Sequence, residues 1–530
     1  MKPSNLIGLA AAALIVATRP GLAQPAYSHF PDVASLHQAM RAGELTAAVL
    51  VERQLARIDL LNPELAAVIA VDPTARAQAR ALDARLADGG WAGPLHGIPV
   101  LVKDNIETRD QPTTAGSLAL ADNNTGRDAP LVARLRESGA VILGKANLSE
   151  WANFRSERSS SGWSAVGGQT RNPYDPARTP CGSSSGSGAA VAAGMAVVAV
   201  GTETNGSIVC PASANGLVGI KPSVGLVSRT HVVPISHTQD TAGPMARSVR
   251  DAVVLLAAMA GADPDDPATA EPAEWAPESL IEHVRDDGLE GKRIGVLRSA
   301  AGFHADVDEL LEAAIATLRA GGAEIVDDLE WQAADGFYGR TYDVLLYEFK
   351  AAIDAYLAAL PDPTLAAMTL DDLIAFNRDH ADEEMAWFGQ EIFIKAAAKG
   401  PLTDKDYTEA LAAVQQATRA DGIDRLLAEH ELDALIAPTG SPAWTIDLVN
   451  GDHFIGGSST LAAVSGYPNV TVPMGRVHGL PVGLSIFGAR YSEPVLIEIA
   501  RGFERAAGGF VAPARGRTGA RTRTNAKPTE

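Results

Sequence analysis

The hydrophobic pattern switches between helical and strand-like spacing several times along the chain. Residues 33–60 place apolar side chains three and four positions apart, which predicts helix. Residues 74–88 predict a surface helix that closes at Gly89. The run GIPVLVKD predicts a strand with its polar end at Lys103. Residues 128–147 predict a helix followed by a strand, an alternation typical of an α/β fold.

A second apolar stretch, rich in alanine and valine, joins two Gly/Ser-rich turns. These turns hold Ser183 and Ser207, which are 24 positions apart. Residues 185–195 predict a helix and residues 196–201 a strand, so the second turn begins where a strand ends. Ligands of open α/β sheets gather at the carboxyl ends of strands. The pattern therefore favours a site in which both hydroxyls face one pocket.

Lys103 ends a buried strand, and burial depresses the pKa of a cationic group. Two hydroxyls and one neutral amine are enough for nucleophilic acyl transfer without histidine. The alternative is a strand-end lysine that reaches solvent, with Gly/Ser turns that only permit tight backbone geometry. The two serine turns together favour catalysis over that alternative.

The same residues resemble the amidase signature family, whose members use a Ser-Ser-Lys triad. The resemblance runs from about residue 30 to about residue 505, and within the family it is strongest to bacterial peptide amidases. It is carried by these motifs: VLVKDN (100–105), CGSSSGSG (181–188), GTETNGSIVCPAS (201–213), GLVGIKPSVGLVS (216–228), QDTAGPMARSV (239–249), LLYEFK (345–350), DALIAPTG (433–440), GYPNVTVPMG (466–475) and GLPVGLSIFG (479–488).

The resemblance implies an α/β amidase signature fold, with a large mixed central β-sheet covered by α-helices on both faces. A single amidase domain would span 24–510, with the catalytic motifs in residues 24–262 and a second half, 291–510, returning to the same sheet. Residues 263–290 are acidic and rich in proline, which predicts an exposed connection. Residues 511–530 predict a disordered basic tail.

Carried over by motif, the family's nucleophile falls on Ser207, the bridging serine on Ser183 and the base on Lys103. Ser183 would relay the proton of Ser207 to the lysine. In the family the peptide bond at the place of Gly182 and Ser183 is cis. Gly182, Ser184 and Asp240 are expected to support the site, Asp240 by tying down a loop. The oxyanion hole is expected from the backbone N–H groups of Thr204, Asn205, Gly206 and Ser207.

Asn205 stands where the family often has glycine. Asparagine tolerates left-handed backbone better than most residues, so the turn should survive. Its side chain would narrow the pocket or bind substrate.

The composition of the chain excludes some classes of binding partner and cofactor. A formal charge of −20 argues against nucleic acid and anionic membranes, which need cationic surface. No metal or nucleotide motif is present, so no cofactor is expected. The two cysteines, Cys181 and Cys210, lack zinc-site spacing. The residues favour two buried thiols over a disulfide bridge, which an oxidising compartment would permit.

The first 23 residues predict a signal peptide. Lys2 precedes an apolar run from 6 to 18, and small residues end at Ala23. The run is shorter than the roughly 20 residues needed to cross a bilayer. We expect a periplasmic or secreted enzyme with no membrane span in its mature form.

The predicted function is an exported serine amidase that hydrolyses a carboxamide, most simply the C-terminal amide of a peptide, to the acid and ammonia. Two other enzymes fit the motifs: a hydrolase of small aryl or alkyl amides, and the amidase subunit of a tRNA-dependent amidotransferase, which the leader disfavours. A non-catalytic binding protein on the same fold is the third alternative.

Overall fold

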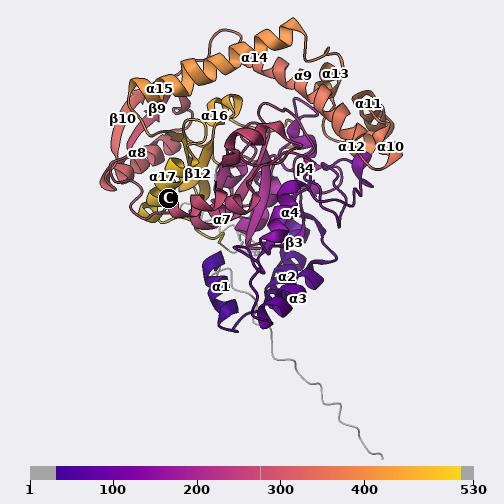
Figure 1. Cartoon of the computed structure of the whole chain (residues 1–530). Helices are drawn as coiled ribbons and strands as arrows, with labels where there is room; N and C mark the ends of the chain where they lie inside the picture. Colours follow the sequence, from indigo (N-terminus) through magenta and orange to yellow (C-terminus); the bar gives the residue numbers. More distant parts are fainter. Residues whose placement is uncertain (1–30, 275, 515–530) are drawn as a thin grey trace, which may run out of the picture.

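A mixed sheet of 11 strands crosses the computed structural model, which describes residues 31–274 and 276–514 (Figure 1). Its strand order is β1-β3-β2-β6-β8-β7-β12-β13-β11-β9-β10. Strands from both halves of the chain therefore share one sheet. The predicted fold class, an amidase-type mixed sheet covered by helices, is confirmed. The predicted signal peptide and residues 515–530 lie outside the described residues.

The parallel strand pairs lie on either side of an antiparallel centre. Strands β3, β2 and β6 run parallel at one side, and β11, β9 and β10 at the other. The strands of the sheet are β1 (Val68–Val71), β2 (Pro99–Lys103), β3 (Val141–Ala146), β6 (Val198–Glu203), β7 (Val218–Lys221), β8 (Thr241–Ala246), β9 (Arg293–Leu297), β10 (Glu324–Leu329), β11 (Ala434–Pro438), β12 (Asn469–Val477) and β13 (Leu480–Phe487). A separate hairpin pairs β4 (Trp163–Ser164) with β5 (Gly168–Gln169).

The helices of the first half follow the predicted pattern with one correction. The helical region predicted at 33–60 is two helices, because the chain turns at Gly43 (φ +72°) and Thr46 caps the second helix. The helices are α1 (Val33–Arg41), α2 (Ala47–Leu65), α3 (Ala75–Ala87), α4 (Pro130–Glu137), α5 (Ser185–Ala192), α6 (Val209–Ala214) and α7 (Val249–Met259).

Neighbouring strands β2 and β6 place the two motif regions at one sheet edge. They run parallel, with Val100 opposite Val198 and Val102 opposite Val200. Their carboxyl ends therefore meet, which brings Lys103 beside the turn that follows β6. Every residue of both strands is buried.

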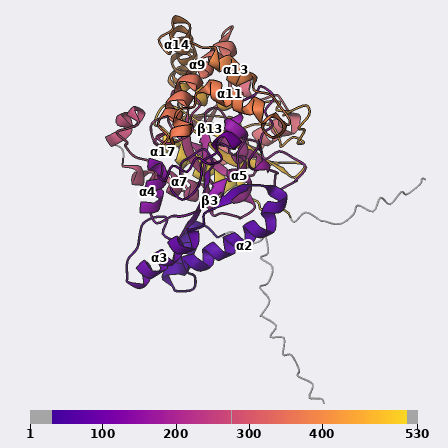
Figure 2. The ribbon, with the colours of Figure 1, turned by 90° about the vertical axis from the view of Figure 1, so that its right-hand side faces the viewer.

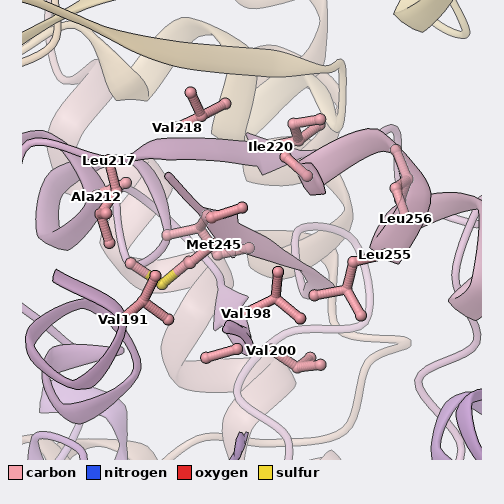
Figure 3. Close-up of a cluster of buried hydrophobic side chains, with 14 of the residues drawn as sticks. Val191, Val198, Val200, Ala212, Leu217, Val218, Ile220, Met245, Leu255 and Leu256 are labelled. Atoms are coloured by element: carbon pink, nitrogen blue, oxygen red, sulfur yellow. The ribbon is translucent and has the colours of Figure 1, made fainter. Parts of the chain in front are cut away.

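A continuous hydrophobic core fixes the position of these strand ends. All eight residues of α5 are buried, and the helix packs against β6 and α6. Figure 3 shows the apolar side chains that join α5, α6 and α7 to the central strands. Its labelled residues are Val191, Val198, Val200, Ala212, Leu217, Val218, Ile220, Met245, Leu255 and Leu256. The two serine turns thus project from a rigid base.

Helices α9 to α14 of the second half form a cap at one end of the molecule (Figure 1), whereas α8 and α17 pack against the sheet. The long helix α9 packs against α13 and α14, and the three lie together in both views (Figures 1 and 2). The second-half helices are α8 (Ala305–Ala320), α9 (Phe337–Ala358), α10 (Pro363–Ala366), α11 (Leu370–Asp379), α12 (Ala381–Glu384), α13 (Glu391–Ala397), α14 (Lys405–Thr418), α15 (Asp424–Glu429), α16 (Ser459–Ser465) and α17 (Glu493–Ala507).

The cap has its own hydrophobic cluster, which includes side chains from the first half. Phe349 of α9 stacks on Phe393 of α13 and meets Phe154 edge to face. Trp151 also meets Phe393 edge to face. The cap is therefore joined to the loop that follows β3, beside the serine turns.

Two predicted surface segments differ from expectation. The connection at 263–290 contains two short 3₁₀ helices, Pro267–Glu274 and Pro277–His283, and it is partly buried. Asp266 is buried and forms an ion pair with Arg229, so this acidic residue does not simply face solvent. Leu280 is fully buried. The predicted tail begins too early, because the carbonyl of Val511 accepts a hydrogen bond from Tyr174.

No helix within the two described ranges combines the length and apolar character needed to cross a membrane.

Candidate active site

Lys103 is the last residue of β2, and its side chain is fully buried. Its Nζ lies 2.7 Å from Ser183 Oγ, 2.8 Å from Thr202 Oγ1 and 3.2 Å from the Thr202 carbonyl oxygen. A neutral amine has two protons and one lone pair. With both N–H groups directed at Thr202, the lone pair is left for the Ser183 hydroxyl. The arrangement suits an amine that accepts a proton from Ser183.

Burial lowers the pKa of Lys103 from its ordinary value to about 7. The negative charges of Asp240 and Glu203 oppose this shift but do not cancel it. A pKa near neutrality leaves a useful fraction of the amine unprotonated at physiological pH.

Ser183 lies in the turn that leads into α5, where the peptide bond between Gly182 and Ser183 is cis. The cis bond expected from the family resemblance is thus confirmed. A Cβ atom at Gly182 would collide with Ser149 Oγ, so a larger residue would have to displace that hydroxyl. The Ser183 carbonyl accepts a hydrogen bond from Ser149 N–H at 3.0 Å, and Ser183 itself is fully buried.

Ser207 lies in the turn between β6 and α6. Its exposed fraction is 9%, whereas Ser183 and Lys103 are at 0%, so of the three it is the residue that substrate can reach. The two serine turns are in direct contact, because Ser184 N–H donates to the Ser207 carbonyl at 3.2 Å. The structure therefore brings all three predicted triad residues to one edge of the sheet.

The carboxylate of Glu203 holds the turn that carries Ser207 (residues 204–208), called the nucleophile turn below. It accepts hydrogen bonds from the backbone N–H groups of Gly206 (2.8 Å), Ile208 (2.7 Å) and Val209 (3.0 Å). This corrects the prediction that Gly206 N–H serves the oxyanion hole, because its proton is already directed at Glu203. Gly206 adopts a left-handed conformation in this turn (φ +81°), which favours glycine.

Three amides remain for an oxyanion hole. The backbone N–H groups of Thr204, Asn205 and Ser207 have no protein acceptor within the described residues, and all three residues line the cavity. The Asn205 side chain accepts a hydrogen bond from Ser459 Oγ at 2.7 Å. Asn205, which stands where the family often has glycine, therefore links the nucleophile turn to the start of α16.

The predicted supporting residues act on the backbone around the site. Asp240 accepts hydrogen bonds from Thr204 Oγ1 (2.6 Å) and from the N–H groups of Ile235 and Ser236. Burial raises the pKa of Asp240. Ser184 Oγ donates to the Thr202 carbonyl at 3.0 Å and accepts from Thr202 N–H at 3.1 Å. Ser184 thus fixes the end of β6 rather than facing substrate.

Cys181 and Cys210 form a disulfide, with Cα atoms 6.0 Å apart. The prediction of two buried thiols is therefore wrong. Sequence spacing favoured thiols because it could not show that the turn before α5 and the start of α6 meet. The bridge joins the segment carrying Ser183 to the segment carrying Ser207.

Beside Ser207 lies a cavity of about 420 Å³. That volume is in the range of small-molecule and peptide sites. Its apolar wall comes from the loop after β3, the loop between β7 and β8, helix α9 and the loop between β11 and α16. The apolar residues in this wall include Phe154, Ile235, Leu345, Trp444 and Phe454.

Two residues that hold the catalytic amine escaped the sequence analysis. Thr202 contacts Lys103, and Asn105 Nδ2 donates to Thr202 Oγ1 at 2.9 Å. The available signal was that both residues sit at the polar ends of adjacent apolar runs. Their contact requires the parallel pairing of β2 and β6, which the sequence does not display.

The comparisons with known proteins agree with this geometry. Residues 49–497 match the family model described as Amidase. The solved structure of peptide amidase from Stenotrophomonas maltophilia is 48% identical, with a TM-score of 0.88 over 92% of this chain and 99% of that one. A structure of peptide amidase in complex with the competitive inhibitor chymostatin is 49% identical, with a TM-score of 0.89 and the same coverage of both chains.

Curated relatives give the same family. The Arabidopsis thaliana protein named "Probable amidase" is 43% identical, over 89% of each chain. One subunit of glutamyl-tRNA(Gln) amidotransferase from Roseiflexus castenholzii is 35% identical, over 89% of this chain and 95% of that one. Because the family model and these relatives cover most of its length, the chain belongs to the amidase signature family of amide hydrolases.

Proposed function

We propose that this amidase removes ammonia from the C-terminal amide of peptides, that it does so through an acyl-enzyme on Ser207, and that it is exported. The observation that carries the mechanism is the contact of 2.7 Å between the fully buried Lys103 amine and Ser183 Oγ. An amine with a pKa of about 7 has the basicity that this step requires.

In the first half-reaction Ser207 Oγ attacks the amide carbonyl carbon. Its proton passes to Ser183 Oγ as the Ser183 proton passes to Lys103 Nζ. The negative oxygen that forms on the substrate is bound by the amides of the nucleophile turn, where one such donor is typically worth about 2.7–4 kcal/mol. The C–N bond then breaks, and the proton returns through Ser183 to the leaving nitrogen, which departs as ammonia.

In the second half-reaction water attacks the ester on Ser207. Lys103 takes the water proton through Ser183 and returns it to Ser207 Oγ when the C–O bond breaks. Free acid is released and the three residues regain their starting protonation. Splitting amide hydrolysis in this way replaces one difficult step by two easier ones.

Peptide amides as substrates are supported by the cavity and by the relatives. The cavity of about 420 Å³ has room for more than a small amide, and its aromatic wall suits peptide side chains. The two solved structures described above are of peptide amidases, at 48% and 49% identity. The amidotransferase alternative is supported by lower identity, 35%.

The decisive experiment measures ammonia from amidated dipeptides, benzamide and glutamine with wild type and the Ser207→Ala variant. We expect amidated dipeptides to be the best substrates and the variant to lose at least ~10⁴-fold in kcat. Ser187→Ala is the matched control, because within the described structure its Oγ donates only to the Val200 carbonyl inside the core. Ammonia release that survives Ser207→Ala would overturn the mechanism, and preference for benzamide or glutamine would overturn the substrate.

A fluorophosphonate probe tests the nucleophile independently of substrate choice. We expect covalent labelling to map to Ser207 in wild type and in Ser187→Ala, and to be lost in Ser207→Ala.

Export is tested separately, by the N-terminal sequence of the protein recovered outside the cytoplasm. A mature N-terminus at residue 24 is expected, and recovery of the full-length chain only from the cytoplasm would overturn export.

A further inference from the structure

A carboxylate that has no cationic partner among the described residues lines the wall of the active-site cavity. Asp452 lies in the loop between β11 and α16. Its Oδ2 accepts a hydrogen bond from Ser161 N–H at 3.0 Å, and its Oδ1 accepts one from Trp444 Nε1 at 3.0 Å. These two bonds hold the carboxylate against the cavity wall.

No lysine, arginine or histidine in the described part of the chain forms an ion pair with Asp452. The surrounding cavity wall partly desolvates its carboxylate, which raises the pKa of Asp452. The two N–H groups act in the opposite direction. Asp452 is also exposed to the cavity, so a cationic group on a bound ligand can reach the carboxylate and pair with it.

Aromatic rings lie beside this carboxylate. The indole of Trp444 points its N–H at Asp452, and Phe454 meets the same indole edge to face with ring centroids 5.8 Å apart. Both rings line the cavity, and 53% of Phe454 is exposed. A carboxylate flanked by aromatic rings is a favourable environment for an organic ammonium group.

We propose that Asp452 is a specificity-determining residue that binds a positively charged group of the peptide substrate. The group is an ammonium or guanidinium carried on the acyl side of the scissile amide, either the peptide's own α-ammonium or a basic side chain. This inference rests on the proposed function and adds to it the class of peptide amide that is preferred.

The test compares kcat/KM for pairs of amidated dipeptides that differ only in one charge. One arm uses Ala-Phe-NH2 against its N-acetylated form. The other uses N-acetyl-Ala-Lys-NH2 against the norleucine analogue. We expect wild type to prefer the charged member of at least one pair by about tenfold, and Asp452→Asn to abolish that preference while leaving the neutral peptides within about twofold.

Asp447→Asn is the matched control, because Asp447 lies in the same loop, caps residues Val449 and Asn450, and does not line the cavity. It should keep the full preference. A purely structural role for Asp452 would lower kcat/KM for charged and neutral peptides equally. Absence of any preference in wild type, or a preference that survives Asp452→Asn, overturns the inference.

Calorimetric binding of the same peptides to Ser207→Ala separates this inference from the proposed function. Tighter binding of the charged peptide, lost on adding Asp452→Asn, supports the cation site even where wild type releases no ammonia from peptides. In that case only the proposed substrate fails. Peptide hydrolysis with equal binding of charged and neutral forms would reject the cation site alone.

Discussion

At Lys103, burial and hydrogen bonding act on the protonation state in opposite directions. Loss of water favours the neutral amine and lowers the pKa to about 7. The negative charges of Asp240 and Glu203 limit this shift. Oxygen atoms of Thr202 and Ser183, at 2.7–3.2 Å, can also accept hydrogen bonds from the charged form. The catalytic amine is therefore adjusted by its immediate contacts and needs no histidine.

The pH dependence of kcat should report this amine. Below its pKa Lys103 carries a proton and cannot accept another, so we expect kcat to rise with pH to a plateau, with the midpoint near pH 7. Thr202→Val removes one oxygen acceptor from the charged amine. Its midpoint should move to lower pH, and kcat on the plateau should fall about tenfold because the amine is held less firmly.

Initial rates of ammonia release between pH 5 and 9 provide the measurement. Thr241→Val is the control, because Thr241 is also a buried threonine, on the neighbouring strand β8, and its Oγ1 bonds only the adjacent Ala242 carbonyl. It should keep the wild-type profile. A kcat that does not change with pH over this range would show that Lys103 is not the base.

At the scale of elements, the site depends on two turns that leave the sheet at the same edge. Helix α5 follows the first turn, β6 precedes the second, and both are packed into the core. The disulfide between Cys181 and Cys210 adds a covalent link across a sequence separation of 29 residues. It constrains the unfolded chain and ties the two turns together in the folded one.

Removal of the disulfide should affect the free energy of unfolding more than the catalytic rate. For a loop of this length, loss of the bridge costs about 3–4 kcal/mol in the chain-entropy model. We expect Cys181→Ser/Cys210→Ser to lower the free energy of unfolding by that amount, and dithiothreitol to do the same to wild type. Urea unfolding monitored by fluorescence provides the measurement.

The double variant is its own control, because the chain has only two cysteines and the variant should not respond to dithiothreitol. Full reduction of the wild type is checked by thiol titration. If the urea midpoint of the fully reduced wild type is unchanged, the expectation is wrong.

At the scale of the whole molecule, a buried arginine joins the catalytic half to the helical cap. Arg155 is fully buried and lies 2.6 Å from Glu150 in the loop after β3. It also donates to the carbonyls of Glu384 (2.7 Å), the last residue of α12, and Gly389 (2.8 Å), in the loop before α13. The cap that closes one side of the cavity is thus held by hydrogen bonds over a long sequence separation.

Arg155→Met should destabilise the protein by about 3–5 kcal/mol, because it leaves the Glu150 carboxylate buried without its partner. Chemical denaturation measures the change in the free energy of unfolding. Arg425→Met is the control: it breaks an exposed pair with Glu429 on α15 and should cost about 0.5 kcal/mol or less. Equal effects of the two substitutions would show that the buried arginine does not hold the cap.

The sequence by itself determined the local parts of the site. Apolar runs ended at Lys103 and before the second serine turn, and motif resemblance assigned the triad and the fold. These features were readable because strand ends and glycine-rich turns depend on neighbours in the chain. The helix boundary near Gly43 was missed because helical spacing continued across it.

Only the tertiary structure decided which distant residues meet. Thr202 contacts Lys103 across 99 positions, and Cys181 pairs with Cys210. Asp452 came to the cavity from the second half of the chain. Such contacts depend on strand pairing and helix packing, so local spacing carries no record of them. The same packing excludes water from Lys103, and that exclusion lowers the pKa of its amine to about 7.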